Sequence, residues 1–161
     1  MIIMKKYWLS LIAMLVTFAG VSADGTAAVP KVSAKATAPD KAVVSGQTFD
    51  VKVNFTASSP IEIMTMTFFA EASKAPADFA AKAKLQYNAK WKTVRIKVAS
   101  CRAADRPKME QKVSIATTGW PAGDYLIWIT CYYRVPGTKK YLDCPAKFPL
   151  TIVEAEAKEA K

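Results

Sequence analysis

The sequence predicts an all-β domain, an antiparallel sandwich of about seven or eight strands. Apolar residues alternate with polar residues along several short segments, and this period of two is typical of strands with one buried face. Gly, Pro, Asn and Ser separate these segments at short intervals, as turns do in sandwiches. Almost no segment has the longer period of an amphipathic helix, so we expect very little helix.

The first 23 residues have the layout of a secretory signal peptide. Lys5 and Lys6 precede an apolar run that begins at Trp8, and small residues close the segment at Ala23. The run is too short to span a membrane comfortably, and no Cys follows Ala23 closely enough to accept a lipid anchor. We therefore expect cleavage after Ala23, a periplasmic or secreted location, and no transmembrane segment in the mature chain.

The mature chain is predicted to hold one sandwich, within residues 24–153. Residues 24–30 are predicted to be a flexible start. Two prolines flank an edge strand near residues 31–37, since proline lacks the donor that a central strand needs. Residues 154–161 contain only Ala, Glu and Lys and are predicted to be a disordered or frayed tail.

The clearest strand covers residues 49–55, where apolar and polar side chains alternate. Residues 61–70 are apolar or Thr at nearly every position, which predicts a central strand covered on both faces. Its Met64 and Met66 are expected on one face, as core residues rather than copper(I) ligands. A short helix is expected over residues 73–79, capped by Ser73.

Residues 81–91 alternate again, and the phase shifts before residues 94–98. A turn or bulge near Asn88 would explain the shift and make a hairpin, with Trp91 close by. The predicted basic patch on its outer face comprises Lys82, Lys84, Lys90, Lys92, Arg95 and Lys97. A positive surface of this kind favours anionic partners, and the alternative is a solvated face that keeps the protein soluble.

The last strands are predicted over residues 111–117, 125–133 and about 140–153. The middle one is the strongest apolar run, so we expect a central strand with both faces apolar. Aromatic residues gather here, and a row of exposed rings could stack against sugars, although core packing is the alternative. The candidates for this surface are Trp120, Trp128, Tyr132 and Tyr141.

Two segments resemble bacterial immunoglobulin-like and fibronectin type III-like domains. Residues 120–129, with the sequence WPAGDYLIWI, are similar to the aGxYxhxh signature near the C-terminal end of such domains. Residues 45–53 resemble their xGxxhxhxh opening. The resemblance implies an immunoglobulin-like sandwich and says little about function. The strand at 49–55 lacks the Cys of antibody domains, so an inter-sheet disulfide of that kind is not implied.

The chain has three cysteines, Cys101, Cys131 and Cys144, and export would permit a disulfide. If residues 136–139 close a symmetric hairpin, Cys131 faces Cys144 at a suitable distance. If Pro136 and Gly137 instead form the centre of the turn, that match is lost. Cys101 is then a free thiol, either activated by basic neighbours or buried, and its pairing with another cysteine stays open.

The chain contains no histidine, which removes the commonest general base and the commonest zinc and copper ligand. Its acids stand in no recognisable catalytic context, and a hydrolase would need two of them in one cleft. We therefore expect no enzyme, no cofactor and no metal. The predicted function is an exported binding or structural module that interacts with an envelope protein. The alternative is a module for glycans or acidic polymers, and nucleic acid is not expected because few rings lie among the charges.

Overall fold

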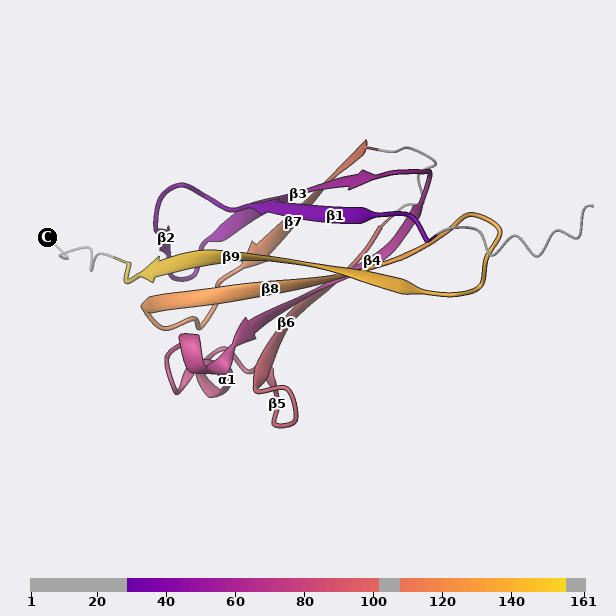
Figure 1. Cartoon of the computed structure of the whole chain (residues 1–161). Coiled ribbons are helices and arrows are strands. Elements are labelled where there is room, and N and C mark those ends of the chain that lie inside the picture. Colours follow the sequence, from indigo (N-terminus) through magenta and orange to yellow (C-terminus); the bar gives the residue numbers. More distant parts are fainter. Residues whose placement is uncertain (1–28, 102–107, 156–161) are drawn as a thin grey trace, which may run out of the picture.

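The computed structural model describes residues 29–101 and 108–155, which form nine strands in two sheets (Figure 1). The strands are β1 Val32–Thr37, β2 Val43–Val44, β3 Thr48–Ala57, β4 Glu62–Glu71, β5 Gln86–Asn88, β6 Thr93–Ser100, β7 Lys108–Ala116, β8 Gly123–Arg134 and β9 Leu142–Val153. Helical structure within these residues is limited to the 3-10 turn η1, Ala72–Lys74, and to α1, Phe79–Lys82. The predicted signal peptide, most of the flexible start and most of the tail lie outside the described residues.

The strand order confirms the predicted fold class. One sheet has the order β1-β3-β7, and the other has the order β2-β9-β8-β4-β6-β5. Neighbouring strands are antiparallel except for β2, which pairs with β9 in parallel. In the lettering used for immunoglobulin domains, β1, β3 and β7 correspond to strands A, B and E of one sheet. β9, β8, β4 and β6 correspond to strands G, F, C and C′ of the other sheet. The protein is an immunoglobulin-like β-sandwich, with more strands than expected.

A hydrogen bond at the start of β8 is typical of this fold. The Tyr125 hydroxyl donates to the backbone oxygen of Pro121 at 2.6 Å. Immunoglobulin-like domains place a tyrosine at this corner and bond its hydroxyl to the backbone a few residues upstream. Ile127, two residues later, stands where antibody domains have a cysteine. The sandwich therefore has the tyrosine corner, while the two positions of the antibody inter-sheet disulfide are not cysteines.

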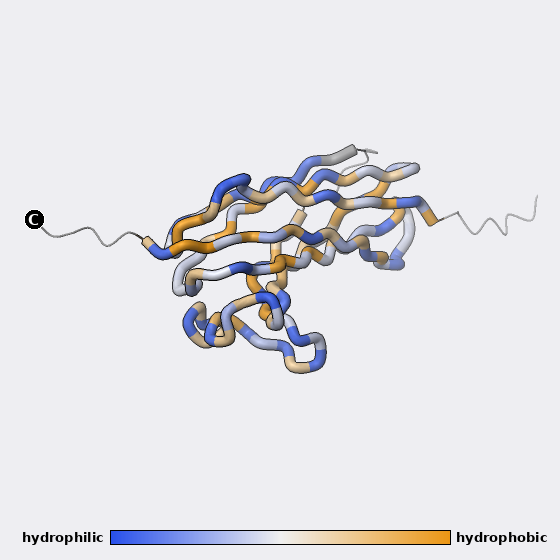
Figure 2. Tube along the Cα trace, turned by 60° about the vertical axis from the view of Figure 1, so that its left-hand side comes forward, coloured by the Kyte–Doolittle hydropathy of each residue, from blue (hydrophilic) through white to orange (hydrophobic). Residues whose placement is uncertain are grey.

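The core lies between the sheets and follows the alternation of the strands. In β3, the side chains of Phe49, Val51, Val53 and Phe55 are buried, and those between them are exposed. Figure 2 shows the same alternation of hydrophobic and hydrophilic residues along the long strands. β8 follows it too: it is a central strand between β9 and β4, as expected, but only one of its faces is buried. Only one face of the larger sheet packs on the other sheet, and the other face of β8 is open.

β4 also departs from the expected pattern. Its pairing with β8 shifts register between Ile63 and Thr65, which leaves Met64 between two successive pairs. Such a bulge turns the following residues to the opposite face. Met66 is consequently fully buried while Met64 is half-buried, so the two methionines do not share a face.

Residues 72–92 connect β4 to β6 and project from the larger sheet (Figures 1 and 2). The helix expected over residues 73–79 is instead the turn η1 followed by α1, and Ser73 caps neither. Of the strand expected over residues 81–91, only β5 forms, and it pairs with the start of β6. α1 buries Phe79 against Trp120 and Tyr125. This packing favours a helical turn at residues whose Ala and Lys composition suits a helix.

Candidate functional site

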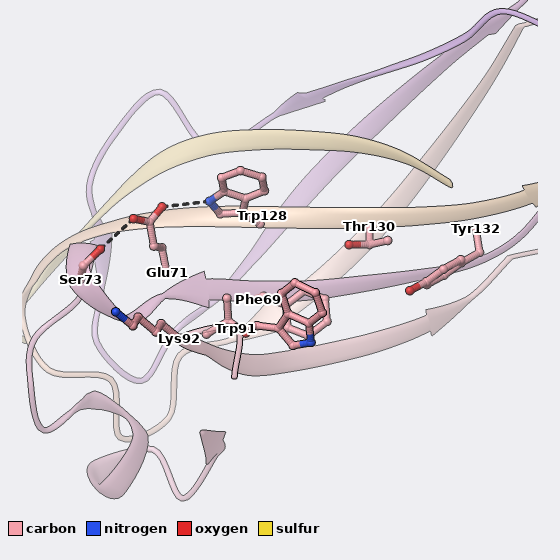
Figure 3. A pocket seen from close by; sticks show the side chains of 9 residues that line it. Phe69, Glu71, Ser73, Trp91, Lys92, Trp128, Thr130 and Tyr132 are labelled. Atoms are coloured by element: carbon pink, nitrogen blue, oxygen red, sulfur yellow. Dashed lines mark hydrogen bonds between the residues drawn. The ribbon is translucent and has the colours of Figure 1, made fainter. Parts of the chain in front are cut away.

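The outer face of the larger sheet carries a groove of about 670 Å³, between β4, β8 and the projecting segment 72–92. It is large enough for a small-molecule or sugar ligand. Its lining residues are Phe69, Glu71, Ser73, Trp91, Lys92, Thr93, Trp128, Thr130 and Tyr132 (Figure 3).

The alternation of β8 turns Trp128, Thr130 and Tyr132 outward, while the residues between them enter the core. The strand register places Trp128 beside Phe69 of β4, so that two rings form part of the groove floor. Trp128 is 38% exposed and Tyr132 is 40% exposed, so both rings can be reached from solvent.

Trp91 enters the groove from the turn between β5 and β6, and it is 68% exposed. Two hydrogen bonds hold this turn. The backbone N–H of Trp91 donates to Asn88 Oδ1 at 3.1 Å, and the N–H of Ala72 donates to the carbonyl of Lys92 at 2.9 Å. The second bond ties the turn to the end of β4. Trp91 and Trp128, from separate elements, thereby line one groove.

The groove contains one carboxylate, that of Glu71, at the end of β4. It accepts hydrogen bonds from the Ser73 hydroxyl at 2.7 Å and from Trp128 Nε1 at 3.2 Å, both drawn in Figure 3. These bonds, that of Ser73 first, lower the pKa of Glu71 below its ordinary value. Glu71 is therefore an oriented, ionised acceptor at neutral pH and is poorly suited to act as a general acid.

Cations surround the aromatic rings. The Nζ atom of Lys90 lies 5.2 Å from the ring centroid of Trp91, and Nζ of Lys147 lies 5.7 Å from that of Trp128. Both distances are within the range of a cation–π interaction. With Lys92 in the lining, three lysines border a groove that holds one carboxylate, so the local charge favours anions.

The six residues of the predicted basic patch do not lie on one hairpin face. Lys82 belongs to α1 and pairs with Asp78 at 2.7 Å, and Lys84 follows that helix. Lys97 extends from β6 toward the other sheet and donates to the carbonyl of Ser114 at 2.6 Å. Arg95 bonds to Gln86 on β5. Lys90 and Lys92 are the two members that the groove brings together with aromatic rings.

The structure brings together two of the four aromatic residues predicted to form a surface. Trp128 and Tyr132 line the groove, and Tyr141 is 57% exposed just before β9, outside the lining. Trp120 is 3% exposed and packs on Phe79 in the core, so its place on an exposed surface was wrong. Trp91, which was not among the predicted residues of the aromatic surface, lines the groove instead. A tryptophan in an otherwise polar turn is an unusual feature, and it could have identified Trp91 as a candidate from the sequence.

Sequence reasoning also missed five other lining residues, which are Phe69, Glu71, Ser73, Thr93 and Thr130. The first two come from the outward side of β4, beyond its bulge, where a simple alternation gives the wrong face. Thr130 lies between two predicted aromatic residues on the same face of β8, and this spacing could have identified it.

Four other acids of the described chain lie in ion pairs outside the groove lining. These pairs are Asp50 with Lys112, Asp78 with Lys82, Glu62 with Arg134, and Glu110 with Lys52. No group of three or more metal-ligating residues occurs within residues 29–101 and 108–155. In the same residues, no helix has the length and apolar character needed to cross a membrane.

Comparisons with known proteins place the chain only by its shape. No protein-family model matches it, and no curated protein matches it. Similar solved structures include the CARDB domain of a Pyrococcus furiosus protein, at 10% identity, covering 78% of this chain and 96% of that one, with a TM-score of 0.49. The C-terminal domain of wzt is 8% identical over 78% of this chain and 74% of that one, with a TM-score of 0.44. A type I cohesin from Pseudobacteroides cellulosolvens is 10% identical, and the match covers 80% of this chain and 97% of the cohesin, with a TM-score of 0.39.

The class of the protein follows from its own strand order and tyrosine corner. It is an immunoglobulin-like β-sandwich with an aromatic groove on the open face of its larger sheet.

Proposed function

We propose that this protein is an exported, non-enzymatic module that binds an acidic glycan in the groove. The observation that carries the proposal is the convergence of Trp91, Trp128 and Tyr132, all partly exposed, on one groove with polar side chains. A pyranose ring has apolar C–H faces that can stack on aromatic rings and hydroxyls at its edge that need hydrogen-bond partners. Apolar walls with a few fixed polar groups are typical of sites that recognise such ligands.

The polar lining suits sugar hydroxyls. The Glu71 carboxylate accepts two hydrogen bonds within the protein, and a carboxylate has about four lone-pair positions, so it can also accept from a ligand. Thr93 and Thr130 add hydroxyls that can both donate and accept. These groups would fix the orientation of a sugar that the rings hold by stacking.

The preference for an acidic glycan is supported by the lysines. Lys92 lines the groove, and Lys90 and Lys147 lie over the two tryptophan rings. A carboxylate or phosphate on the sugar would meet these cations at the edge of the rings. The attraction would weaken as salt rises, because the lysines are exposed.

The test compares a groove tryptophan with an exposed ring outside the groove. Binding of an acidic oligosaccharide, such as an oligogalacturonate, is measured by titration calorimetry at low and near-physiological salt. We expect Trp91→Ala to weaken binding about tenfold or more, in line with the energy of stacking on an aromatic side chain. The matched control Tyr141→Ala should bind like the unmodified chain. Equal losses in both variants, or no binding of any acidic saccharide, would contradict the proposal.

Export is supported by residues 1–23, whose pattern is that of a signal peptide. The test is to produce the whole chain in a bacterium and sequence the N-terminus of the protein in the periplasm and medium. A mature start at Asp24 is expected. Retention of the full-length chain in the cytoplasm would contradict this part of the proposal.

A second candidate, binding of an envelope protein, is favoured by the edge strand β7. Its nine residues pair with β3 alone among the described strands, which leaves its other edge available to an added strand. The Ser114 carbonyl on this strand accepts a hydrogen bond from Lys97. Ser114→Pro would remove one backbone donor from β7, together with the hydroxyl that bonds to Asp50 of β3, and Ser114→Ala, which removes the hydroxyl alone, is the control. Loss of partner binding with unchanged glycan binding would support an edge-strand interaction.

A further inference from the structure

We infer that Cys131 and Cys144 form a disulfide that joins β8 to β9, and that Cys101 remains a thiol. All three side chains are thiols in the structure. The inference is independent of what the groove binds.

The strand register brings the first two cysteines together. β8 and β9 pair through eleven successive residues, from Gly123 with Ile152 to Tyr133 with Leu142, and Cys131 faces Cys144 within this unbroken ladder. Facing residues of antiparallel strands have Cα atoms about 4.5 to 5.5 Å apart, which lies within the range that disulfides accept. Pro136 and Gly137 do form the centre of a turn, which the Thr138 N–H closes on the Val135 carbonyl at 3.0 Å. The register that pairs Cys131 with Cys144 forms nevertheless, so the expectation that such a turn loses the match was wrong.

Both side chains also point the same way. Cys131 is fully buried and Cys144 is 5% exposed, both on the face of the sheet that packs into the core. The neighbouring Cys144 side chain and burial raise the pKa of the Cys131 thiol. Because the two residues face each other and both side chains are buried on the same side of the sheet, a disulfide would need no change of strand pairing.

The sheet order excludes the rival pairings with Cys101. This residue follows β6, and its backbone N–H donates to the Met64 carbonyl at 2.9 Å, which keeps it beside β4. β4 lies between β6 and β8, so Cys101 is separated from Cys131 by about two strand spacings, or ~9.5 Å. Cα atoms more than about 7 Å apart cannot be bridged without movement of the backbone.

Cys101 is half-buried, and burial raises the pKa of its thiol. The basic neighbours expected to activate it, Arg102 and Arg106, lie outside the described residues, so that expectation stays a prediction. A thiol with a raised pKa is more fully protonated at neutral pH, and a protonated thiol attacks disulfides poorly.

Formation of the bond requires a disulfide oxidant, such as oxidised glutathione or a thiol–disulfide oxidoreductase. The thiolate of one cysteine attacks a sulfur of the oxidant, forming a mixed disulfide and releasing one thiolate. The second cysteine then attacks its partner's sulfur and releases the other thiolate. The two thiols lose two protons and two electrons, and the electrons reduce the oxidant to two thiols.

The test refolds the full chain in a buffer of oxidised and reduced glutathione, alkylates it in denaturant without reductant, and maps the peptides by mass spectrometry. We expect alkylation of Cys101 only, and a linked pair of peptides containing Cys131 and Cys144 that is two hydrogen atoms lighter than the separate peptides. The variant Cys101→Ser, which changes a half-buried side chain, should form the same link. Alkylation of all three cysteines, or any linked peptide that contains Cys101, would overturn the inference.

Discussion

The tyrosine corner gives a quantitative test of the fold assignment. Tyr125→Phe removes the hydroxyl that donates to Pro121 and leaves the ring in contact with Phe79 and Trp120, at centroid distances of 5.0 and 5.2 Å. A net hydrogen bond contributes about 0.5 to 1.5 kcal/mol, and an acceptor left unsatisfied in a partly buried place adds to the loss. We expect the free energy of unfolding at neutral pH to fall by about 1 to 2 kcal/mol.

The same substitution changes the dependence of stability on alkaline pH. Burial, with the nearby charge of Asp78, raises the pKa of Tyr125 above its ordinary value of 10.0. The unfolded chain therefore loses this proton first, and the contribution to stability is complete below about pH 10 and declines as pH rises further. Tyr133, whose pKa burial also raises, is present in both proteins and cancels in the comparison. The stability difference between wild type and Tyr125→Phe should shrink above pH 10.

The assay is denaturant unfolding followed by tryptophan fluorescence, at pH 7 and at pH values from 10 to 11. The control is Tyr87→Phe, because Tyr87 is 51% exposed and its substitution should alter stability by less than about 0.5 kcal/mol. The reasoning is refuted if Tyr125→Phe is as stable as wild type at pH 7, or if its deficit grows with pH.

Two further predictions concern stability. A Cβ at Gly119 would lie 2.5 Å from the carbonyl oxygen of Lys82, whereas one at Gly46 meets nothing within 4 Å, and both residues have positive φ. Gly46→Ala should therefore lower the free energy of unfolding by about 1 to 2 kcal/mol, because of its positive φ alone. Gly119→Ala should lower it by clearly more, as measured by denaturant unfolding. Equal losses in the two variants would contradict the close packing of Gly119 on Lys82. Reduction of the bond between Cys131 and Cys144 should lower the free energy of unfolding by about 3 kcal/mol, and equal stability of both forms would argue against a structural bond.

The sequence predicted those parts of the fold in which local pattern and tertiary packing agree. The alternation at residues 49–55 identified β3, because every second side chain enters the core. The predicted facing of Cys131 and Cys144 is confirmed by the strand register, although the turn that joins the strands is centred on Pro136 and Gly137 and is not the symmetric one. Both are properties of strand pairing, where a shift by one residue would expose the buried face.

The errors occur where a contact distant in sequence decides local structure. Residues 72–92 contain few large apolar side chains, so their Ala and Lys pattern fits a strand or a helix equally well. The packing of Phe79 on Trp120 selects the helical turn and at the same time buries Trp120. The sequence alone does not reveal that Phe79 and Trp120 contact each other. The bulge at Met64 is likewise invisible in composition, although it decides which β4 residues face outward.

The candidate site was predictable only in part for the same reason. Trp128 and Tyr132 lie on one strand, and their spacing placed them on one face. Trp91 and Glu71 reach the groove because the turn after Asn88 is hydrogen-bonded to the end of β4. This closure brings the end of β4 and the turn before β6 together, although the whole of segment 72–92 separates them in sequence. The periodicity of the sequence cannot predict such a contact.

The described chain enters and leaves the sandwich at opposite ends, with β1 beginning at one end and β9 finishing at the other (Figure 1). Tension between the two ends would therefore act along these strands, while the ladder hydrogen bonds run across them. Many bonds would bear the load together instead of opening one after another. A sandwich held by both ends would in this way resist shear while the open face of its larger sheet stays accessible at the side.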